Sequence, residues 1–531
     1  MATTLREASQ RALTRIEDRF TGVFGKGCNP FFHLGALTIY FFWIALISGL
    51  YLFAFFDTSV YGAFQSVERL THDQWWLGGI MRSLHRYASD AAVITMVLHL
   101  VREFVRDRFR GVRWYSWFTG VPLLWMVFML GITGYWMVWD MLAQYIAIVS
   151  AEYMDWLPFF ADPIARNFIS QESLSDRFFT LMGFLHLIGL PLILVFAIWF
   201  HVMRISGPRV NPPRALMVGS LLSMLGLSLV KPAVSHEAAD LAAVPTQLSL
   251  DWFYLFIYPV IDAWSAGPVW VLLTLGTLLL MALPWLPPKK PEPVAEIDLE
   301  HCSGCTWCAN DCPYGALTMR PRTDGRAHKQ EVVIDPSVCV SCGICGGSCP
   351  SATPFRKSEK LTTGIQLPQF SFHRLRDETD ATLDASTANS KIIVFGCDHA
   401  AHVDALKAEG IAAVSLPCTG MLSPSMIDYA LRDQRADGVV VTGCCEGDCL
   451  HRLGNTWMEQ RIRGDRPPML RSRVNRDRVH VHWASSTDLA TLRSEIAAFG
   501  ERLRTLEPDV PAATRPKPTT STAPEQSTAG V

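Results

Sequence analysis

The sequence predicts a multidomain protein with an all-α transmembrane helix bundle of about six spans, a small α+β cysteine-rich module and a small parallel α/β domain. Two asymmetries indicate this division. The long apolar runs all lie before residue 288, and 13 of the 14 cysteines follow residue 300. A formal net charge of −2 gives no reason to expect a nucleic-acid partner.

Six apolar segments have about the length needed to cross 30 Å of hydrocarbon, and they define a membrane domain over residues 30–288. They are residues 32–56, 79–105, 118–139, 178–202, 215–230 and 268–285. We expect an aromatic loop around Tyr153 and Trp156 after the third span. Residues 1–29 alternate charged and apolar residues, which indicates an amphipathic helix on the membrane surface rather than a cleavable signal peptide.

Basic residues predict the orientation of these spans. Arginines or lysines follow the second, fourth and sixth spans, at residues 102–113, 204–214 and 289–290. Such loops stay on the cytoplasmic side, and an even number of spans then returns the chain to the cytoplasm. We therefore expect a multi-pass protein of a bacterial or archaeal cytoplasmic membrane, with its cysteine-rich domains in the cytoplasm.

Four histidines in the apolar part of the chain have matched spacings. His85 and His99 are fourteen residues apart, and His186 and His201 are fifteen apart. At about 100° per residue both spacings return to the same helix face, roughly 21–22 Å along the axis. Two such helices side by side would ligate two stacked b-type haems. The alternative is four unrelated histidines that line helices, but ionisable residues are rare in membrane helices.

Two pairs of glycines have the same fourteen-residue spacing as His85 and His99. Gly35 and Gly49 lie in the first span, Gly120 and Gly134 lie in the third, and both pairs are fourteen apart. Glycine leaves space for a flat macrocycle between helices. Close helix–helix contact at small residues is the alternative explanation, and the shared period favours haem.

Residues 30–286 resemble cytochrome b of the quinol-oxidising bc and b6f-type complexes. The resemblance lies in Arg82-Ser-Leu-His85, His99-Leu-Val-Arg102, the two glycine pairs and the His186/His201 pair. It implies that His85 and His186 hold a periplasmic-side haem, and that His99 and His201 hold a cytoplasmic-side haem. Arg82 and Arg102 occupy the positions of propionate partners, and we expect the cytochrome b part to form a homodimer.

The resemblance extends to a quinone site. Leu250-Asp251-Trp252-Phe253-Tyr254 stands where the family has Pro-Glu-Trp-Tyr, whose Glu takes a proton from quinol. Asp251 is therefore the expected proton acceptor, and a solvated carboxylate without that role is the alternative. His33 stands where the b6 branch attaches an extra haem through cysteine, so no covalent haem is expected there; it borders a cytoplasmic-side quinone site in one interpretation.

A doubled cysteine motif follows the membrane domain. Cys302-x2-Cys305-x2-Cys308-x3-Cys312-Pro313 is repeated as Cys339-x2-Cys342-x2-Cys345-x3-Cys349-Pro350. This is the pattern of bacterial two-cluster ferredoxins, in which the fourth cysteine of each run ligates the other cluster. We predict a bacterial ferredoxin module over residues 296–356 with two [4Fe–4S] clusters. Zinc binding is the alternative, and the terminal Cys-Pro pairs make it the weaker one.

Residues 389–508 alternate predicted strands with predicted helices, which indicates a small parallel α/β domain. The strands are residues 391–395, 412–416, 438–442 and 479–482, and the helices are residues 402–409, 423–433, 450–462 and 487–506. Residues 352–388 carry few signals and are expected to form a connector. Residues 509–531, rich in Pro, Thr, Ser and Ala, are expected to be disordered.

The cysteines of this last domain lie close to predicted strand ends. Cys397, Cys418 and Cys444 each follow a strand, and Cys449 lies one loop later. Sites in open α/β sheets gather at the carboxyl ends of the strands, so four thiolates there predict a [2Fe–2S] cluster. Cys445 is a competing ligand, and buried cysteines without a metal are the alternative.

The stretch from Gly443 to Cys449 resembles the delta subunit of methyl-viologen-reducing hydrogenases. That family relays electrons between an oxidoreductase and heterodisulfide-reductase-type proteins. The resemblances together imply a membrane electron-transfer protein that links the quinone pool to a cytoplasmic redox partner, either heterodisulfide-reductase-like or hydrogenase-like.

The alternative function is a membrane anchor and docking subunit. It would connect a separate enzyme to the haems and would have no quinone site of its own. A redox-sensing role is a third hypothesis, but the sequence has no recognisable output domain for it. The sequence order predicts a route from the partner to the C-terminal cluster, then to the ferredoxin clusters, the cytoplasmic-side haem and quinone.

Overall fold

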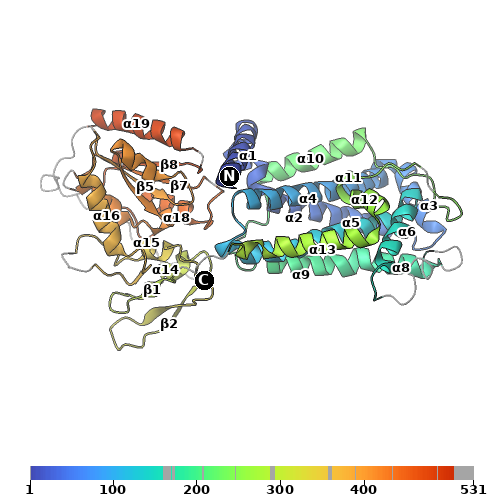
Figure 1. Cartoon of the computed structure of the whole chain (residues 1–531), viewed down its shortest axis with the longest axis horizontal. Coiled ribbons are helices and arrows are strands. Elements are labelled where there is room, and N and C mark those ends of the chain that lie inside the picture. The colour runs from blue at the N-terminus through green and yellow to red at the C-terminus, as the bar shows by residue number, and fades with distance from the viewer. Residues whose placement is uncertain are drawn as a thin grey trace, which may run out of the picture.

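The structure is a computed structural model that describes residues 2–159, 169, 174–205, 208–244, 247–287, 293–356, 361–388, 390–432, 435–445, 447–486 and 488–506. A bundle of long helices forms one half of the molecule, and the strand-containing part lies beyond one end of that bundle (Figure 1). The amphipathic segment is helical as α1 (Ala2–Phe24), which lies at the same end of the bundle. The expected disordered tail, residues 509–531, falls outside the described residues.

All six apolar segments are helical. They form α2 (Leu34–Ala54), α4 (Ile80–Val105), α5 (Trp114–Val138), α8–η5–α9 (Asp176–Val202), α10 (Arg214–Val230) and α13–η6 (Ala266–Trp285). Four of them are long and apolar enough to cross a membrane, and the two that fall short are α4 and α10. α4 carries charged residues such as Arg86 and Asp90 among its apolar ones, and α10 is only 17 residues long.

Shorter helices close the bundle at the end far from the strands (Figure 1). These are α3 (Gly62–His72), α6 (Met141–Asp155), α11 (Trp252–Leu255) and α12 (Ile257–Trp264). The prediction that Tyr153 lies in an aromatic loop is wrong, because this residue belongs to α6. Its ring stacks on that of Trp270, with 4.3 Å between ring centroids. Asp140 starts α6 because its side chain accepts a hydrogen bond from the Ala143 N–H at 2.9 Å.

The ferredoxin module pairs its short strands in two antiparallel ribbons. β1 (Glu296–Ile297) pairs with β4 (Ile365–Gln366), and β2 (Leu317–Pro321) pairs with β3 (Gln330–Ile334). Two one-turn helices, α14 (Trp307–Asp311) and α15 (Ile344–Ser348), each begin inside a cysteine motif.

The expected connector over residues 352–388 is wrong, because it contains β4 and the helix α16 (Phe372–Asp384). Phe372, Leu375 and Leu383 of α16 are buried in a core that also contains Ile393 and Phe395 of the next domain. Their spacing of three and eight residues places them on one helix face, and Ser371 caps the helix through the Arg374 N–H. The ferredoxin module and the α/β domain therefore share one apolar core.

The last domain has a four-stranded parallel sheet. Its strands are β5 (Ile392–Cys397), β6 (Ala412–Leu416), β7 (Gly438–Gly443) and β8 (Val479–Trp483), in the order β6-β5-β7-β8. Every residue of β5 and β7 is buried, which explains why these strands read as continuous apolar runs. The chain reverses its direction across the sheet between β5 and β7, where ligand sites of such folds form at the carboxyl ends.

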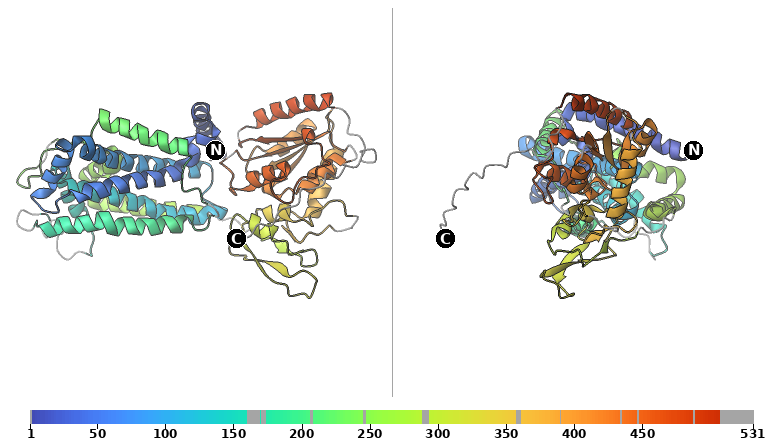
Figure 2. Two further views of the ribbon diagram at one scale, coloured as in Figure 1. Left: turned by 180° about the vertical axis from the view of Figure 1, so that it is seen from behind. Right: turned by 90° about the vertical axis from the view of Figure 1, so that its left-hand side faces the viewer.

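Helices cover both faces of this sheet (Figure 2). α19 (Leu489–Thr505) and the 3₁₀ helix η7 (Val403–Glu409) pack on Ile392 and Val394. α17 (Pro424–Leu431) and α18 (Gly454–Arg463) pack on Ile393 and Phe395, whose side chains point to the opposite face. The predicted strands and helices are thus present, although the first predicted helix is a 3₁₀ helix.

Candidate redox sites

The four membrane histidines form two pairs across the bundle. The rings of His85 on α4 and His186 in η5 (Leu185–Gly189) have centroids 6.2 Å apart and planes at 71°. His99 lies further along α4, near His201 on α9. η5 is a π-helical turn, a local widening of the helix that often occurs at functional sites. The structure thus brings these histidines together two by two, and their roles as haem ligands stay a prediction.

Each of the four predicted glycines faces one of these histidine rings. A Cβ atom built on the glycine would approach the nearest ring atom to 2.8 Å at Gly49 (His85), 2.9 Å at Gly134 (His186), 3.0 Å at Gly120 (His201) and 3.6 Å at Gly35 (His99). A side chain at the first three positions would collide with the imidazole or displace it. The glycines therefore keep the space beside each histidine open, and this arrangement fits a flat macrocycle between the helices.

Hydroxyl groups hold the Nδ1 side of three of these rings. Thr133 Oγ1 lies 3.1 Å from His186 Nδ1, and Thr119 Oγ1 lies 3.3 Å from His201 Nδ1. His85 Nδ1 lies 2.8 Å from the Ala45 carbonyl oxygen and 3.4 Å from Ser48 Oγ. Contacts of this kind fix the ring orientation and leave Nε2 for a metal.

These hydroxyl residues were missed in the sequence, although a signal was present. Ser48, Thr119 and Thr133 each directly precede one of the predicted glycines. One helical turn therefore supplies both the open space beside a ring and the hydrogen-bond partner of that ring.

The two arginines that the resemblance assigns to propionates contact carboxylates of the chain. Arg82 lies 3.4 Å from Glu68 Oε1 and donates to Ser235 Oγ at 2.6 Å. Arg102 is 5% exposed and donates to Glu17 Oε1 at 2.8 Å and to Asp448 Oδ1 at 2.5 Å. Their role beside haem stays a prediction.

Asp251 lies in a buried polar group rather than in solvent. Its carboxylate accepts hydrogen bonds from the Tyr135 hydroxyl and from Arg86 Nη2, both at 2.6 Å, and its side chain is 5% exposed. Arg86 also lies 3.3 Å from Asp90 Oδ2, and Asp90 Oδ1 is buried without a hydrogen-bond partner among the described residues. Asp251 is therefore not a solvated carboxylate, while both its proton role and the alternative without that role stay open.

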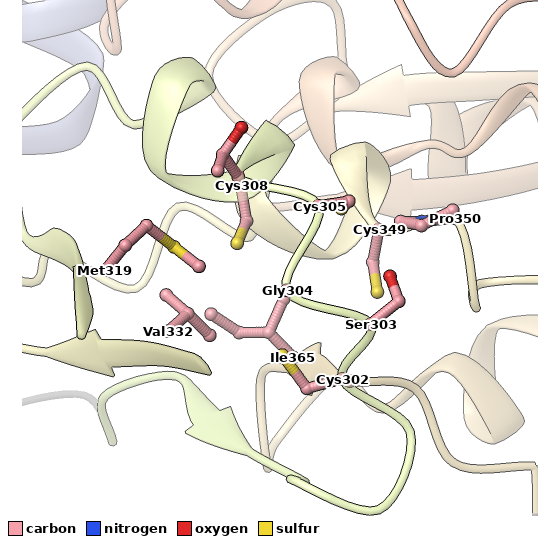
Figure 3. A pocket seen from close by; sticks show the side chains of 12 residues that line it. Cys302, Ser303, Gly304, Cys305, Cys308, Met319, Val332, Cys349, Pro350 and Ile365 are labelled. Carbon is pink, nitrogen blue, oxygen red and sulfur yellow. The ribbon is translucent and has the colours of Figure 1, made fainter. Parts of the chain in front are cut away.

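The eight ferredoxin cysteines line two separate cavities. The first cavity is lined by Cys302, Cys305, Cys308 and Cys349, and the second by Cys312, Cys339, Cys342 and Cys345. Each run thus contributes its fourth cysteine to the other cavity, in the arrangement that the spacing predicts. Figure 3 shows the sulfurs of Cys302, Cys308 and Cys349 around the first cavity. Four thiols around each cavity fit a [4Fe–4S] cluster.

The cysteines of the α/β domain meet at the carboxyl edge of its sheet. Cys397 ends β5, Cys418 follows β6 and Cys444 follows β7, and all three are buried together with Cys449. The thiol of Cys449 contacts those of Cys418 and Cys444, and Cys444 also contacts Cys397. Cys445 Sγ instead lies 3.9 Å from the Trp483 carbonyl oxygen. The thiols of Cys397, Cys418, Cys444 and Cys449 together fit an iron–sulfur cluster.

A buried histidine that the sequence analysis missed lies two residues after Cys449. His451 is 4% exposed, and its Nδ1 lies 2.9 Å from the Tyr314 hydroxyl of the ferredoxin module. Burial lowers the pKa of His451 to about 4, so the ring is neutral at pH 7. No short motif marks this residue, because its importance comes from contact with a different domain.

Comparison with protein-family models matches three segments of the chain. Residues 23–207 match cytochrome b/b6/petB, residues 301–353 match the 4Fe-4S dicluster domain, and residues 390–507 match the delta subunit of methyl-viologen-reducing hydrogenase. One similar solved structure is described as "Hyperthermophilic respiratory Complex III", with 18% identity, a TM-score of 0.40 and coverage of 52% of this chain and 82% of that chain. The family matches confirm the three resemblances predicted from the sequence.

Proposed function

Since the chain joins a cytochrome b/b6-type segment, a 4Fe-4S dicluster domain and a segment of the methyl-viologen-reducing hydrogenase delta-subunit family, we propose that this membrane electron-transfer protein connects the quinone pool with a cytoplasmic redox partner. Its cofactors in this proposal are two b haems, two [4Fe–4S] clusters and one [2Fe–2S] cluster. The cofactors supply the electron chemistry, and the chain sets their spacing and surroundings.

The observation that carries this proposal is the match of each histidine with a glycine in the bundle. Four unrelated histidines would have no reason to lie against the four glycines of a fourteen-residue repeat. His85 with His186 would hold one haem, and His99 with His201 would hold the other. Both pairs lie in the helical half, while all twelve proposed cluster cysteines lie beyond residue 300.

Quinol is the proposed substrate of the group around Asp251. Arg86 directly follows His85 in α4, so its contact with Asp251 puts this carboxylate near the proposed periplasmic-side haem. The phenol ring of Tyr135 also lies 4.8 Å from the Arg86 guanidinium carbon. Oxidation of quinol to quinone releases two electrons and two protons. The two haems of the proposal would take the two electrons one after the other, and Asp251 would accept the first proton and pass it to solvent before it accepts the second.

On the other side of the membrane, the partner is proposed to be a heterodisulfide-reductase-like or hydrogenase-like protein of the cytoplasm. This proposal rests on the delta-subunit match over residues 390–507 and on the basic loops that follow alternate spans. A homodimer of the cytochrome b part belongs to the same proposal.

A quinone pulse tests the proposed function. The purified full chain is reduced with dithionite, excess reductant is removed, and a soluble quinone is added while haem absorbance is followed. We expect rapid haem oxidation in the native chain and slower oxidation in Asp251→Asn. Asp262→Asn is the matched control, because Asp262 also accepts from a tyrosine hydroxyl but lies in an exposed contact with Tyr145. Haems that quinone does not oxidise would favour the membrane-anchor alternative.

A further inference from the structure

The position of the α/β domain points to an order of redox centres that differs from the order in the sequence. We propose that the C-terminal cluster exchanges electrons directly with the haem of His99 and His201, and that both ferredoxin clusters lie on its far side. This inference rests on the proposed function and specifies its electron route.

The first contact that supports the route joins the α/β domain to the end of α4. Asp448 directly precedes the cluster cysteine Cys449, and Arg102 lies three residues after the haem histidine His99. Arg102 Nη2 donates to Asp448 Oδ1 at 2.5 Å, and Arg108 Nη1 lies 2.8 Å from the same oxygen. All three charged residues are at least nine-tenths buried.

The charge balance of this contact makes it specific. The Asp448 carboxylate faces two guanidinium groups, those of Arg102 and Arg108. Glu17 of α1 supplies a second carboxylate to Arg102. A buried guanidinium that lost its carboxylate would be strongly unfavourable, so this part of the α/β domain is held against α4.

Two further contacts extend the same interface. Arg113 Nη2 donates to the Leu450 carbonyl oxygen at 2.8 Å, on the other side of Cys449 from Asp448. A Cβ atom built on Gly447 would lie 3.6 Å from Cβ of Phe32, which precedes α2 and its Gly35. The loop over residues 447–450 thus rests on the segments that carry His99 and its glycine.

A second interface joins the α/β domain to the ferredoxin module. Tyr314 lines the second ferredoxin cavity, and its hydroxyl lies 2.9 Å from Nδ1 of His451. Cys342 of that cavity and Cys418 of the C-terminal site belong to one buried apolar cluster. The fully buried Arg461 of α18 fixes this interface by donating to Asp311 Oδ2 at 2.5 Å.

These interfaces put the C-terminal site between the haem end of the bundle and the second ferredoxin cavity. Residues of the ferredoxin module alone line the first cavity, so its cluster is the terminal centre and faces the cytoplasmic partner. This order replaces the route expected from the sequence. Each step moves one electron from a reduced centre to its oxidised neighbour without forming a bond, and quinone takes two electrons and two protons to become quinol.

Cluster-selective variants distinguish the two routes. The full chain is reduced with dithionite, mixed with a soluble quinone and frozen at successive times for EPR. In Cys449→Ser we expect the haems to be oxidised at the native rate and the ferredoxin clusters to lose their fast phase of oxidation. In Cys312→Ser, which removes a ligand of the second ferredoxin cluster, we expect the C-terminal cluster to keep its fast phase. The dithionite-reduced spectra verify which clusters are assembled.

A variant that keeps every cysteine protects the test against failed assembly. Combined Arg108→Gln and Arg113→Gln substitutions weaken the α4 interface, and we expect all three clusters to lose their fast phase while haem oxidation stays fast. Arg493→Gln, which removes an exposed pair with Glu409, should behave like the native chain. Fast oxidation of the ferredoxin clusters in Cys449→Ser would overturn the route. Loss of the fast oxidation phase of the C-terminal cluster in Cys312→Ser would also overturn it. Haems that quinone fails to oxidise in the native chain would instead refute the proposed function.

Discussion

A Cβ atom built on Gly134 would lie 2.9 Å from Cε1 of His186, so α5 can approach this imidazole only because residue 134 has no side chain. In Gly134→Ala we expect the haem content to fall from about two per chain towards one. Pyridine haemochrome analysis of the purified protein measures this ratio.

Gly276→Ala is the matched control for that substitution. Gly276 also lies inside a membrane helix, α13, but a Cβ atom built on it would have no described atom of another segment within 4 Å. Alanine should therefore be tolerated there, and its helix propensity exceeds that of glycine by about 1 kcal/mol. Full haem content in Gly134→Ala would show that the glycine does not serve the haem site.

The histidine pairs make a separate prediction. His99→Ala should remove the haem that His99 shares with His201 and leave the haem of His85 and His186, so about one haem per chain remains. His186→Ala should remove the other haem. Absorbance spectra at low temperature should show that the two variants keep different haems. A His99→Ala protein that retains both haems would contradict the pairing.

Cys312 lies with Cys339, Cys342 and Cys345 around the second ferredoxin cavity. In Cys312→Ser we expect loss of that cluster and retention of the first, since the first cavity keeps all four thiols. Iron content should fall by about four atoms per chain, the content of one [4Fe–4S] cluster, and EPR identifies the remaining cluster. Cys302→Ser is the reciprocal variant, and selective loss of the same cluster in both would contradict the crossed ligation.

Asp311 and Arg461 predict how firmly the ferredoxin module and the α/β domain hold together. Their side chains are 5% and 0% exposed, and removal of one partner of such a buried pair costs about 3–5 kcal/mol. Asp311→Asn should therefore lower the temperature at which the iron–sulfur absorbance is lost.

Glu409→Gln is the control for that substitution, because it removes the exposed pair with Arg493, which is worth about 0–1 kcal/mol. Equal thermal stability of Asp311→Asn and the control would show that the Asp311–Arg461 pair does not hold the interface.

Much of this architecture follows from patterns that are local in the sequence. The histidine and glycine repeats follow from the periodicity of the α-helix, because fourteen residues make about four turns. The cysteine spacing follows from the loop that surrounds a cluster. The strands β5 and β7 are recognisable because complete burial makes them continuous apolar runs. The helix α16 was missed because its apolar residues are separated by charged ones, such as Arg374 and Asp377, on the exposed face.

Contacts between domains have no comparable signal in a single sequence. Asp448 and Arg102 are separated by 346 residues, and neither residue type predicts the other. His451 and Tyr314 similarly come into contact only when the two domains pack together. The proposed order of the redox centres therefore differs from their order in the chain, which was the only guide that the sequence offered.

In the proposed function, electrons pass between quinone and the iron–sulfur clusters through the haems. A quinone pulse on the dithionite-reduced full chain, followed simultaneously by haem absorbance and by EPR of the clusters, measures both steps in one experiment. We predict that haem oxidation comes first and that oxidation of the clusters follows in the same chain. Clusters that stay reduced after the haems of the native protein have been oxidised by quinone would contradict it.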